Sequence, residues 1–66
     1  MNNVVCQIHW NYVSIHRNGP EIGTVSEING EPIIQMLTDC PQLSFIDLDI
    51  IRENWEMMKE LDLRGA

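Results

Sequence analysis

Residues 4–16 show the two-residue apolar period of a β-strand. From residue 4 to residue 12, every second side chain is apolar, which places these side chains on one face of a strand. They are Val4, Cys6, Ile8, Trp10 and Tyr12, with Gln7, His9 and Asn11 on the opposite face. Beyond Tyr12 the alternation slips by one position, because Val13 and Ile15 are apolar. The slip predicts a bulge or a break near residues 11–13.

A second strand is predicted at residues 21–28, between two turn signals. An Asn-Gly pair at 18–19 precedes this strand and a second Asn-Gly pair at 29–30 ends it. Pro20 has no amide hydrogen, so the first turn is expected to be longer than a two-residue hairpin loop. Gly23 interrupts the apolar pattern, which favours an edge position or a bulge.

The period of the pattern changes after the second Asn-Gly pair. Apolar residues now recur at the spacing i, i+3, i+4 and i+7, which places them on one face of a helix. They are Ile33, Met36, Leu37 and Cys40. Pro32 suits the first turn of a helix, and Pro41 would end it. The pattern therefore predicts a short helix of about two turns over residues 32–40.

The last part of the chain predicts a brief extended segment that runs into a C-terminal amphipathic helix, from about Asp47 to Leu61. Asp47 or Asp49 is expected to cap the start of this helix. Together the elements predict an α+β fold in a single small domain of residues 1–66. Its small antiparallel sheet of two or three strands would be packed by the short helix and the C-terminal helix.

An acidic stripe follows one side of the predicted C-terminal helix. At 100° per residue, four carboxylates fall within an arc of about 60°. They are Asp49, Glu53, Glu56 and Glu60. Arg52 and Lys59 stand beside the stripe and are expected to pair with its carboxylates. Such a stripe is typical of a solvated helix face. The alternative is a surface that imitates nucleic-acid phosphates or docks on a basic protein.

The opposite side of the same helix is apolar over about 180°, wider than the ~100° that faces a single core. A helix with so broad an apolar arc is expected to have two neighbours, and the second would be another copy of the chain or a partner protein. The hypothesis assigns partner binding to Ile51, Trp55, Met57, Met58 and Leu61. Trp10 and Trp55 could both lie in the core layer between sheet and helix, or one of them could lie at an interface.

The size and charge of the chain narrow its function. A chain of 66 residues buries only about 60% of its unfolded surface, so a disulfide, a metal or self-association usually completes its stability. Its two cysteines allow at most one disulfide, and no signal peptide or membrane span is visible. A cytoplasmic protein with reduced thiols is therefore expected. Ten acids against four scattered bases give a net charge of −6, which disfavours direct nucleic-acid binding.

Candidate chemistry is sparse. The side chains that could bind zinc are Cys6, His9, His16 and Cys40. On a strand, however, Cys6 and His9 would point to opposite faces, so we expect no metal and no cofactor. Two carboxylates at 47 and 49 are more typical of helix caps than of a general acid–base pair. No Gly-rich phosphate loop or catalytic constellation is present, so we do not expect an enzyme.

The sequence therefore favours a small acidic protein–protein interaction module that acts as a homodimer and binds another protein. By analogy alone, a short acidic chain of this kind resembles accessory proteins of phages and mobile elements that inhibit or redirect a host protein. The alternative is an acidic nucleic-acid mimic that blocks the DNA- or RNA-binding site of a basic protein. A zinc-dependent mini-domain or a thiol enzyme is the third hypothesis. Direct contact with nucleic acid or with a membrane is not expected.

Overall fold

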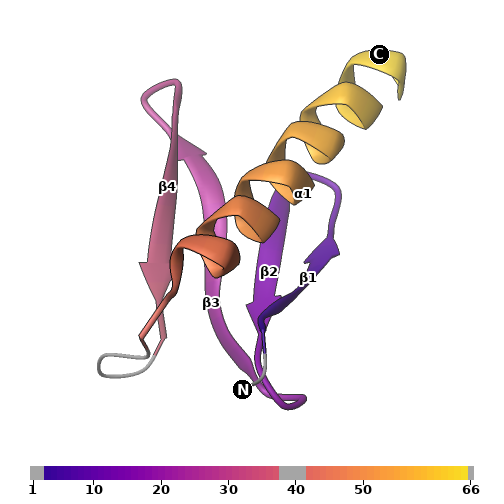
Figure 1. The fold of residues 1–66 in the computed structure, drawn as a ribbon. Coiled ribbons are helices and arrows are strands. Elements are labelled where there is room, and N and C mark those ends of the chain that lie inside the picture. The colour runs from indigo at the N-terminus through magenta and orange to yellow at the C-terminus, as the bar shows by residue number, and fades with distance from the viewer. Residues whose placement is uncertain (1–2, 38–41, 66) are drawn as a thin grey trace.

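The computed structural model describes residues 3–37 and 42–65, which form four strands followed by one helix (Figure 1). The elements are β1 (Val5–Ile8), β2 (Tyr12–His16), β3 (Glu21–Ile28), β4 (Glu31–Met36) and α1 (Phe45–Gly65). The strands pair in chain order as an antiparallel sheet, with β1 and β4 at its edges. The predicted α+β class is confirmed, but the sheet has four strands where two or three were predicted.

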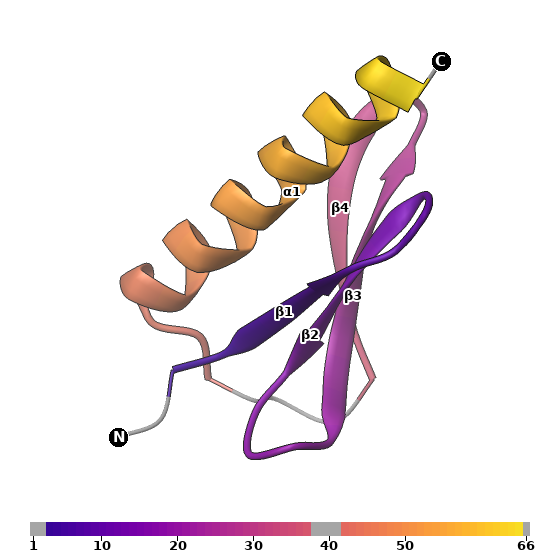
Figure 2. The same ribbon diagram turned by 90° about the vertical axis from the view of Figure 1, so that its right-hand side faces the viewer.

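Helix α1 covers only part of the sheet. It lies on one side of the strands and runs obliquely to them (Figure 2). It packs on β1 and β2, while β3 and β4 form the other half of the sheet. Almost every residue of β4 is exposed, and only Met36 is partly buried. The apolar cover that α1 provides is therefore concentrated at one edge of the sheet.

The core lies between this half of the sheet and α1. Its buried apolar residues are Val4, Val13, Ile15, Ile22, Val25, Ile51, Trp55 and Met58. The members from α1 recur at spacings of three and four residues, so they form one stripe along the helix. Val13 and Ile15 of β2 have no exposed surface at all. Strand β2 is thus the centre of the packing.

The slip in the N-terminal alternation marks a reversal of the chain. Strands β1 and β2 form an antiparallel hairpin in which Ile8 lies opposite Val13. The His9 amide closes the hairpin by donating to the Tyr12 carbonyl at 2.9 Å. Trp10 lies in the connection and is 85% exposed, so its predicted place on an apolar strand face is wrong. Even-numbered residues face α1 in β1, and odd-numbered residues face it in β2. A single two-residue period drawn through the turn cannot describe both strands.

The prediction for residues 21–28 is confirmed, since β3 spans this range. Its Gly23 does not lie at an edge, because β3 pairs with both β2 and β4. The predicted irregularity is present as a shift of register beside Ile15 of β2. A Cβ atom at Gly23 would lie 2.8 Å from the Gln35 carbonyl oxygen and 2.9 Å from the Met36 sulfur. Glycine is thus required by the close approach of β4.

The predicted short helix over residues 32–40 is wrong in its described part. Residues 31–36 form β4, and residues 38–40 lie outside the described ranges. Asn29 and Gly30 have φ angles of 54° and 83°, which suit the two-residue turn that joins β3 to β4. The adjacent β-branched residues Ile33 and Ile34 also favour a strand. The helical spacing misled because short apolar runs fit either period.

The C-terminal helix is confirmed, although it begins at Phe45 and its cap is Ser44. The Asp47 amide donates to the Ser44 hydroxyl oxygen at 3.0 Å, and the Ser44 amide donates to the Asp47 carboxylate at 3.0 Å. This reciprocal pair is a capping box, in which two otherwise unpaired amides at the start of a helix are satisfied. Asp47 is therefore the third residue of the helix, where its negative charge also favours the N-terminal end of the helix dipole.

Candidate functional site

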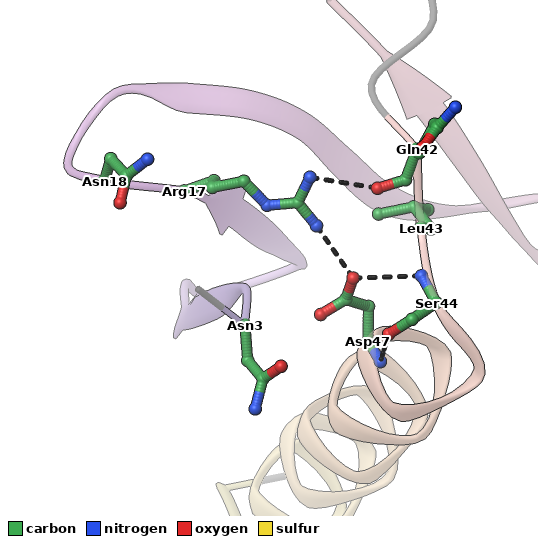
Figure 3. Close-up of a pocket in the computed structure, with 7 residues that line it drawn as sticks. All are labelled: Asn3, Arg17, Asn18, Gln42, Leu43, Ser44 and Asp47. Carbon is green, nitrogen blue, oxygen red and sulfur yellow. Dashed lines mark hydrogen bonds and ion pairs between the residues drawn. The ribbon is translucent and has the colours of Figure 1, made fainter. Parts of the chain in front are cut away.

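A polar network around Asp47 joins α1 to the sheet (Figure 3). Asp47 is only 3% exposed, and its carboxylate accepts hydrogen bonds from the Val4 amide at 3.1 Å and the Ser44 amide at 3.0 Å. The Arg17 guanidinium completes the network, with one nitrogen 2.7 Å from the Asp47 carboxylate and another 2.9 Å from the Gln42 carbonyl oxygen. The start of β1, the segment after β2 and the start of α1 therefore meet at one carboxylate.

These contacts set the ionisation of two groups. The Ser44 and Val4 amides, and then the Arg17 charge, lower the pKa of Asp47 below its ordinary value because they stabilise the carboxylate. Burial raises the pKa of the Cys6 thiol, and the nearby negative charge of Asp47 raises it further. The Cys6 thiol is consequently protonated at neutral pH, which makes it a weak nucleophile.

A pocket of about 470 Å³ opens beside this network. It is lined by Asn3, Arg17, Asn18, Gln42, Leu43, Ser44 and Asp47. The charges of Arg17 and Asp47 cancel, and two guanidinium nitrogens already donate to protein oxygens (Figure 3). The third, Nε, is buried and has no partner within the part of the chain that the structure describes. The pocket thus presents no net charge to a ligand, and its polar groups serve to hold α1 against the sheet.

A second polar cluster lies on the face of the sheet away from α1. The Ser14 hydroxyl oxygen is 2.8 Å from Nε2 of His9 and 2.8 Å from Nε2 of His16. Nδ1 of His16 faces the Gly19 carbonyl at 3.3 Å, and the His9 ring stacks on Tyr12 at 4.3 Å. A carbonyl can only accept, so His16 carries its proton on Nδ1 when neutral. Ser14 then donates to His16 and accepts from Nε2–H of His9.

This histidine–serine–histidine cluster resembles a nucleophile beside two bases, but the serine is out of reach. Ser14 is 0% exposed, because the two imidazoles and the neighbouring strands cover it. A hydroxyl that no substrate can approach cannot act in acyl transfer. The cluster satisfies the hydrogen bonds of a buried polar side chain in the sheet.

The structure does not assemble the zinc ligands considered from the sequence. Cys6 lies opposite Ile15 and packs against the core, on the α1 side of the sheet. His9 and His16 lie on the other face, around Ser14. Cys40 falls outside the described residues. Within residues 3–37 and 42–65, no group of three or more His, Cys, Asp or Glu side chains is arranged to hold a metal.

The acidic stripe lies on the solvent side of α1. Its members Asp49, Glu53, Glu56 and Glu60 are all exposed. At 100° per residue they are roughly opposite the buried stripe of the same helix. Arg52 pairs with Asp49 at 3.3 Å, as expected for neighbours on a helix. Lys59 instead reaches Glu27 of β3 at 3.1 Å, and its ammonium group lies 6.0 Å from the Trp55 ring centre.

The predicted partner-binding arc is divided by the fold. Its members Ile51, Trp55 and Met58 lie in the core. Met57 and Leu61 are about half exposed. The ion pair of Lys59 with Glu27 shows which flank of α1 faces β3. At 100° per residue, Met57 and Leu61 lie on the opposite flank of the helix, with the buried Trp55 between them and Lys59. Two of the five residues are therefore accessible to a partner, on the flank that turns away from β3.

Further exposed apolar residues lie where the sequence predicted a helix or a core. Ile33 and Ile34 are adjacent in β4, so their side chains point to opposite faces of the sheet, and both are exposed. Leu37 after β4 and Phe45 in the first turn of α1 are more exposed still. The sequence did contain a signal for this strand. Two β-branched residues closely follow an Asn-Gly turn, a pattern that favours the second strand of a hairpin.

Comparison with protein-family models, with curated proteins and with solved structures finds no match to this chain. Among the described residues, no helix combines the length and apolar character needed to cross a bilayer. The structural class of the chain therefore comes from its own fold and not from a relative. The chain is a small α+β protein in which one helix covers half of a four-stranded antiparallel sheet.

Proposed function

We propose that this chain is a small acidic protein–protein interaction module that acts as a homodimer and binds a further protein through its exposed apolar surface. One observation carries the proposal: among the residues that the structure describes, more large apolar side chains are exposed than are buried in the core. The exposed ones are Val5, Trp10, Ile28, Ile33, Ile34, Leu37, Phe45, Ile46, Leu48, Met57 and Leu61. Single exposed apolar residues are ordinary, whereas exposed apolar residues that lie together form the patches typical of interaction surfaces.

The total surface supports the same proposal. The chain exposes 4899 Å², whereas a compact monomer of its mass of 7.6 kDa exposes about 4,300 Å². The excess is about 600 Å² per chain, which approaches the share that each partner contributes to a specific interface. The Cα radius of gyration of 11.7 Å likewise exceeds the roughly 10.8 Å of a compact domain of this length.

The acidic stripe favours a second candidate, a mimic of nucleic-acid phosphates that occupies the binding site of a basic protein. All four carboxylates of the stripe are exposed and lie on the side of α1 that points away from the sheet. Binding through this surface would be driven by charge, so it would weaken steeply as salt is raised.

Two sets of variants are expected to separate these candidates in affinity capture from lysate of the source cell. We expect Met57→Glu with Leu61→Glu to weaken capture of the main partner at least about tenfold, because a charge enters an apolar contact. The triple variant Glu53→Gln, Glu56→Gln and Glu60→Gln is expected to change it little. Retention should persist at high salt, and the proteins retained are identified by mass spectrometry.

Both sets alter exposed positions, so circular dichroism should show an unchanged fold and each set serves as the control for the other. The reverse pattern would transfer the function to the stripe: loss with the glutamines, loss with salt and no effect of the apolar substitutions. Equal capture by the parent and both variants would contradict both candidates.

A further inference from the structure

The two edges of the sheet differ in how their backbone is covered. At the β1 edge, α1 packs on one face of the strand, where Cys6 and Ile8 are partly buried, and the Val4 amide just before the strand donates to the Asp47 carboxylate. Among the described residues, β4 pairs with β3 alone, and its residues from Glu31 to Gln35 are exposed. An exposed edge presents unpaired amides and carbonyls, which form a template for another strand.

The hairpin between β3 and β4 decides which groups of β4 are free. Ile28 and Glu31 flank the two-residue turn, so their backbone groups hydrogen-bond to each other. Along the rest of the antiparallel pair, every second pair of opposite residues is hydrogen-bonded in the same way. The Leu37 amide donates to the Ile22 carbonyl at 2.8 Å, which agrees with this alternation. The odd-numbered positions of β4 therefore point their backbone groups toward β3.

The even-numbered positions of β4 point their backbone groups outward. They are Pro32, Ile34 and Met36. Ile34 and Met36 each offer an amide and a carbonyl, whereas Pro32 offers only a carbonyl. The free edge is thus short and has a defined pattern of two donors and three acceptors.

A second copy of β4 matches this pattern when the two strands run antiparallel across a two-fold axis perpendicular to the sheet. With Ile34 opposite its own copy, the two identical residues exchange two hydrogen bonds. Met36 then lies opposite the Pro32 of the other copy, and each Met36 amide meets a Pro32 carbonyl. All four outward amides of the two strands are satisfied. A contact centred on Pro32 instead would place two residues without amides opposite each other.

The charges permit this contact. Each copy carries a net charge of −6, so a stable pair must meet where carboxylates are few. Strand β4 has one carboxylate, Glu31, at its end. In the register centred on Ile34, Glu31 faces the Leu37 of the other copy and is far from its own equivalent. The acidic stripe lies on the solvent side of α1 and takes no part.

From these observations we infer that β4 is the self-association site, and that two copies join edge to edge through an Ile34–Ile34 pair into one eight-stranded sheet with both helices on the same face. The inference rests on the proposed function, of which it names the partner and the contact strand.

Backbone N-methylation of Ile34 tests the inference, because it removes one outward amide and leaves every side chain in place. The 66-residue chain can be made by total chemical synthesis. We expect sedimentation equilibrium, from about 1 µM to about 500 µM, to show a dimer for the parent chain and a dissociation constant raised at least about 30-fold for the variant, since two hydrogen bonds and close strand contact are lost.

The matched control is N-methylation of Ile8, whose amide points outward at the β1 edge because the neighbouring His9 amide bonds within its hairpin. It should leave the dimer unchanged, and circular dichroism should show both variants folded. A parent dimer that Ile34 methylation does not weaken would overturn the β4 assignment and leave the proposed function standing. A parent chain that is monomeric throughout would overturn both this inference and the proposed homodimer.

Discussion

Replacing Trp55 with alanine is expected to remove most of the folding free energy of the chain. Trp55 is the largest side chain of the core, where it is 9% exposed and packs in one cluster with Ile51, Met58 and the strands. Truncation of a buried aromatic residue costs about 3–5 kcal/mol. A domain of this length is stable by only about 3–10 kcal/mol. We therefore expect Trp55→Ala to be largely unfolded at 37 °C, measured by urea titration and circular dichroism.

The second tryptophan provides a matched control. Trp10 is 85% exposed in the β1–β2 connection, so Trp10→Ala makes the same chemical change with almost no loss of buried area. Its urea midpoint should stay close to that of the parent chain, and its remaining fluorescence should report a buried indole. If the two substitutions destabilised the chain equally, the core assigned to Trp55 would be incorrect.

This expectation also changes how the binding surface must be tested. A loss of binding in Trp55→Ala or Met58→Ala would follow from unfolding and would say nothing about contact with a partner. Met57 and Leu61 lie on the same helix and are about half exposed, so they can be changed without removing core area. They are the positions of the arc at which a binding defect can be separated from a folding defect.

The second large effect is expected at Asp47. Asp47→Ala would leave the Arg17 guanidinium without its ion-pair partner, and would leave the Val4 and Ser44 amides without an acceptor. Removing one partner of a buried ion pair costs about 3–5 kcal/mol, because the other charge stays desolvated and unpaired. We expect a comparable loss in the free energy of unfolding by urea titration. Asp49→Ala is the control, since Asp49 is exposed and its pairing with Arg52 contributes little.

The stability attributed to Asp47 should depend on pH in a defined direction. The pKa of Asp47 is lowered in the folded chain from its ordinary value of 3.8, so the folded state binds this proton less readily than the unfolded state. The ionised Asp47 therefore contributes its full stabilisation at pH values above this ordinary pKa. That stabilisation is lost as the pH falls through the lower pKa of the folded chain. The stability difference between the parent and Asp47→Asn should therefore be constant near neutrality and shrink below about pH 4.

A difference between the parent and Asp47→Asn that stayed constant down to about pH 2 would contradict the charged role of Asp47. Comparing the two chains at each pH removes the effect of the other acidic residues, which titrate in both. The same experiment with Asp49→Asn should give no pH-dependent difference, because Asp49 is exposed and lies outside the network.

Local patterns in the sequence were sufficient where an element has a strong period and clear ends. Strand β3 lies between two turn signals, and α1 has a long amphipathic period, so both are present as predicted. The cap was predicted at Asp47 or Asp49 and is instead Ser44, although a serine followed three residues later by an acid was an available signal for a capping box. What could not be read was the tertiary use of Asp47, which depends on Val4 and Arg17 arriving from distant parts of the chain.

The errors in the fold arise where the choice depends on partners elsewhere in the chain. The segment after Gly30 fits a helical spacing, but β3 supplies a strand edge and Gly23 gives the space for Met36 to pack against it. Trp10 fits the alternation of β1, but the hairpin turn removes it from the sheet. In both places, long-range pairing overrides a short local pattern.

The binding surface predicted from the sequence stays a prediction, but the packing of α1 divides its residues between the core and the surface. The width of the apolar arc on α1 indicated two neighbours, and the described structure supplies one, the β1–β2 half of the sheet. The sequence could not assign residues to the two sides, because Met57 and Met58 are adjacent and only the packing distinguishes them. The exposed pair Ile33 and Ile34 was missed entirely, since its strand had been read as a helix.

The most direct test of the proposed function is the self-association of the unmodified chain at low and high salt. Sedimentation equilibrium from about 1 µM to about 500 µM would detect micromolar dissociation constants. Measurements in about 0.05 M and about 1 M NaCl compare weak with strong screening of the charges. We expect a dimer whose dissociation constant stays the same or falls at high salt, because the proposed contact contains no ion pair and screening reduces the repulsion between two acidic chains. A monomer at every concentration and both salt levels would contradict the central claim.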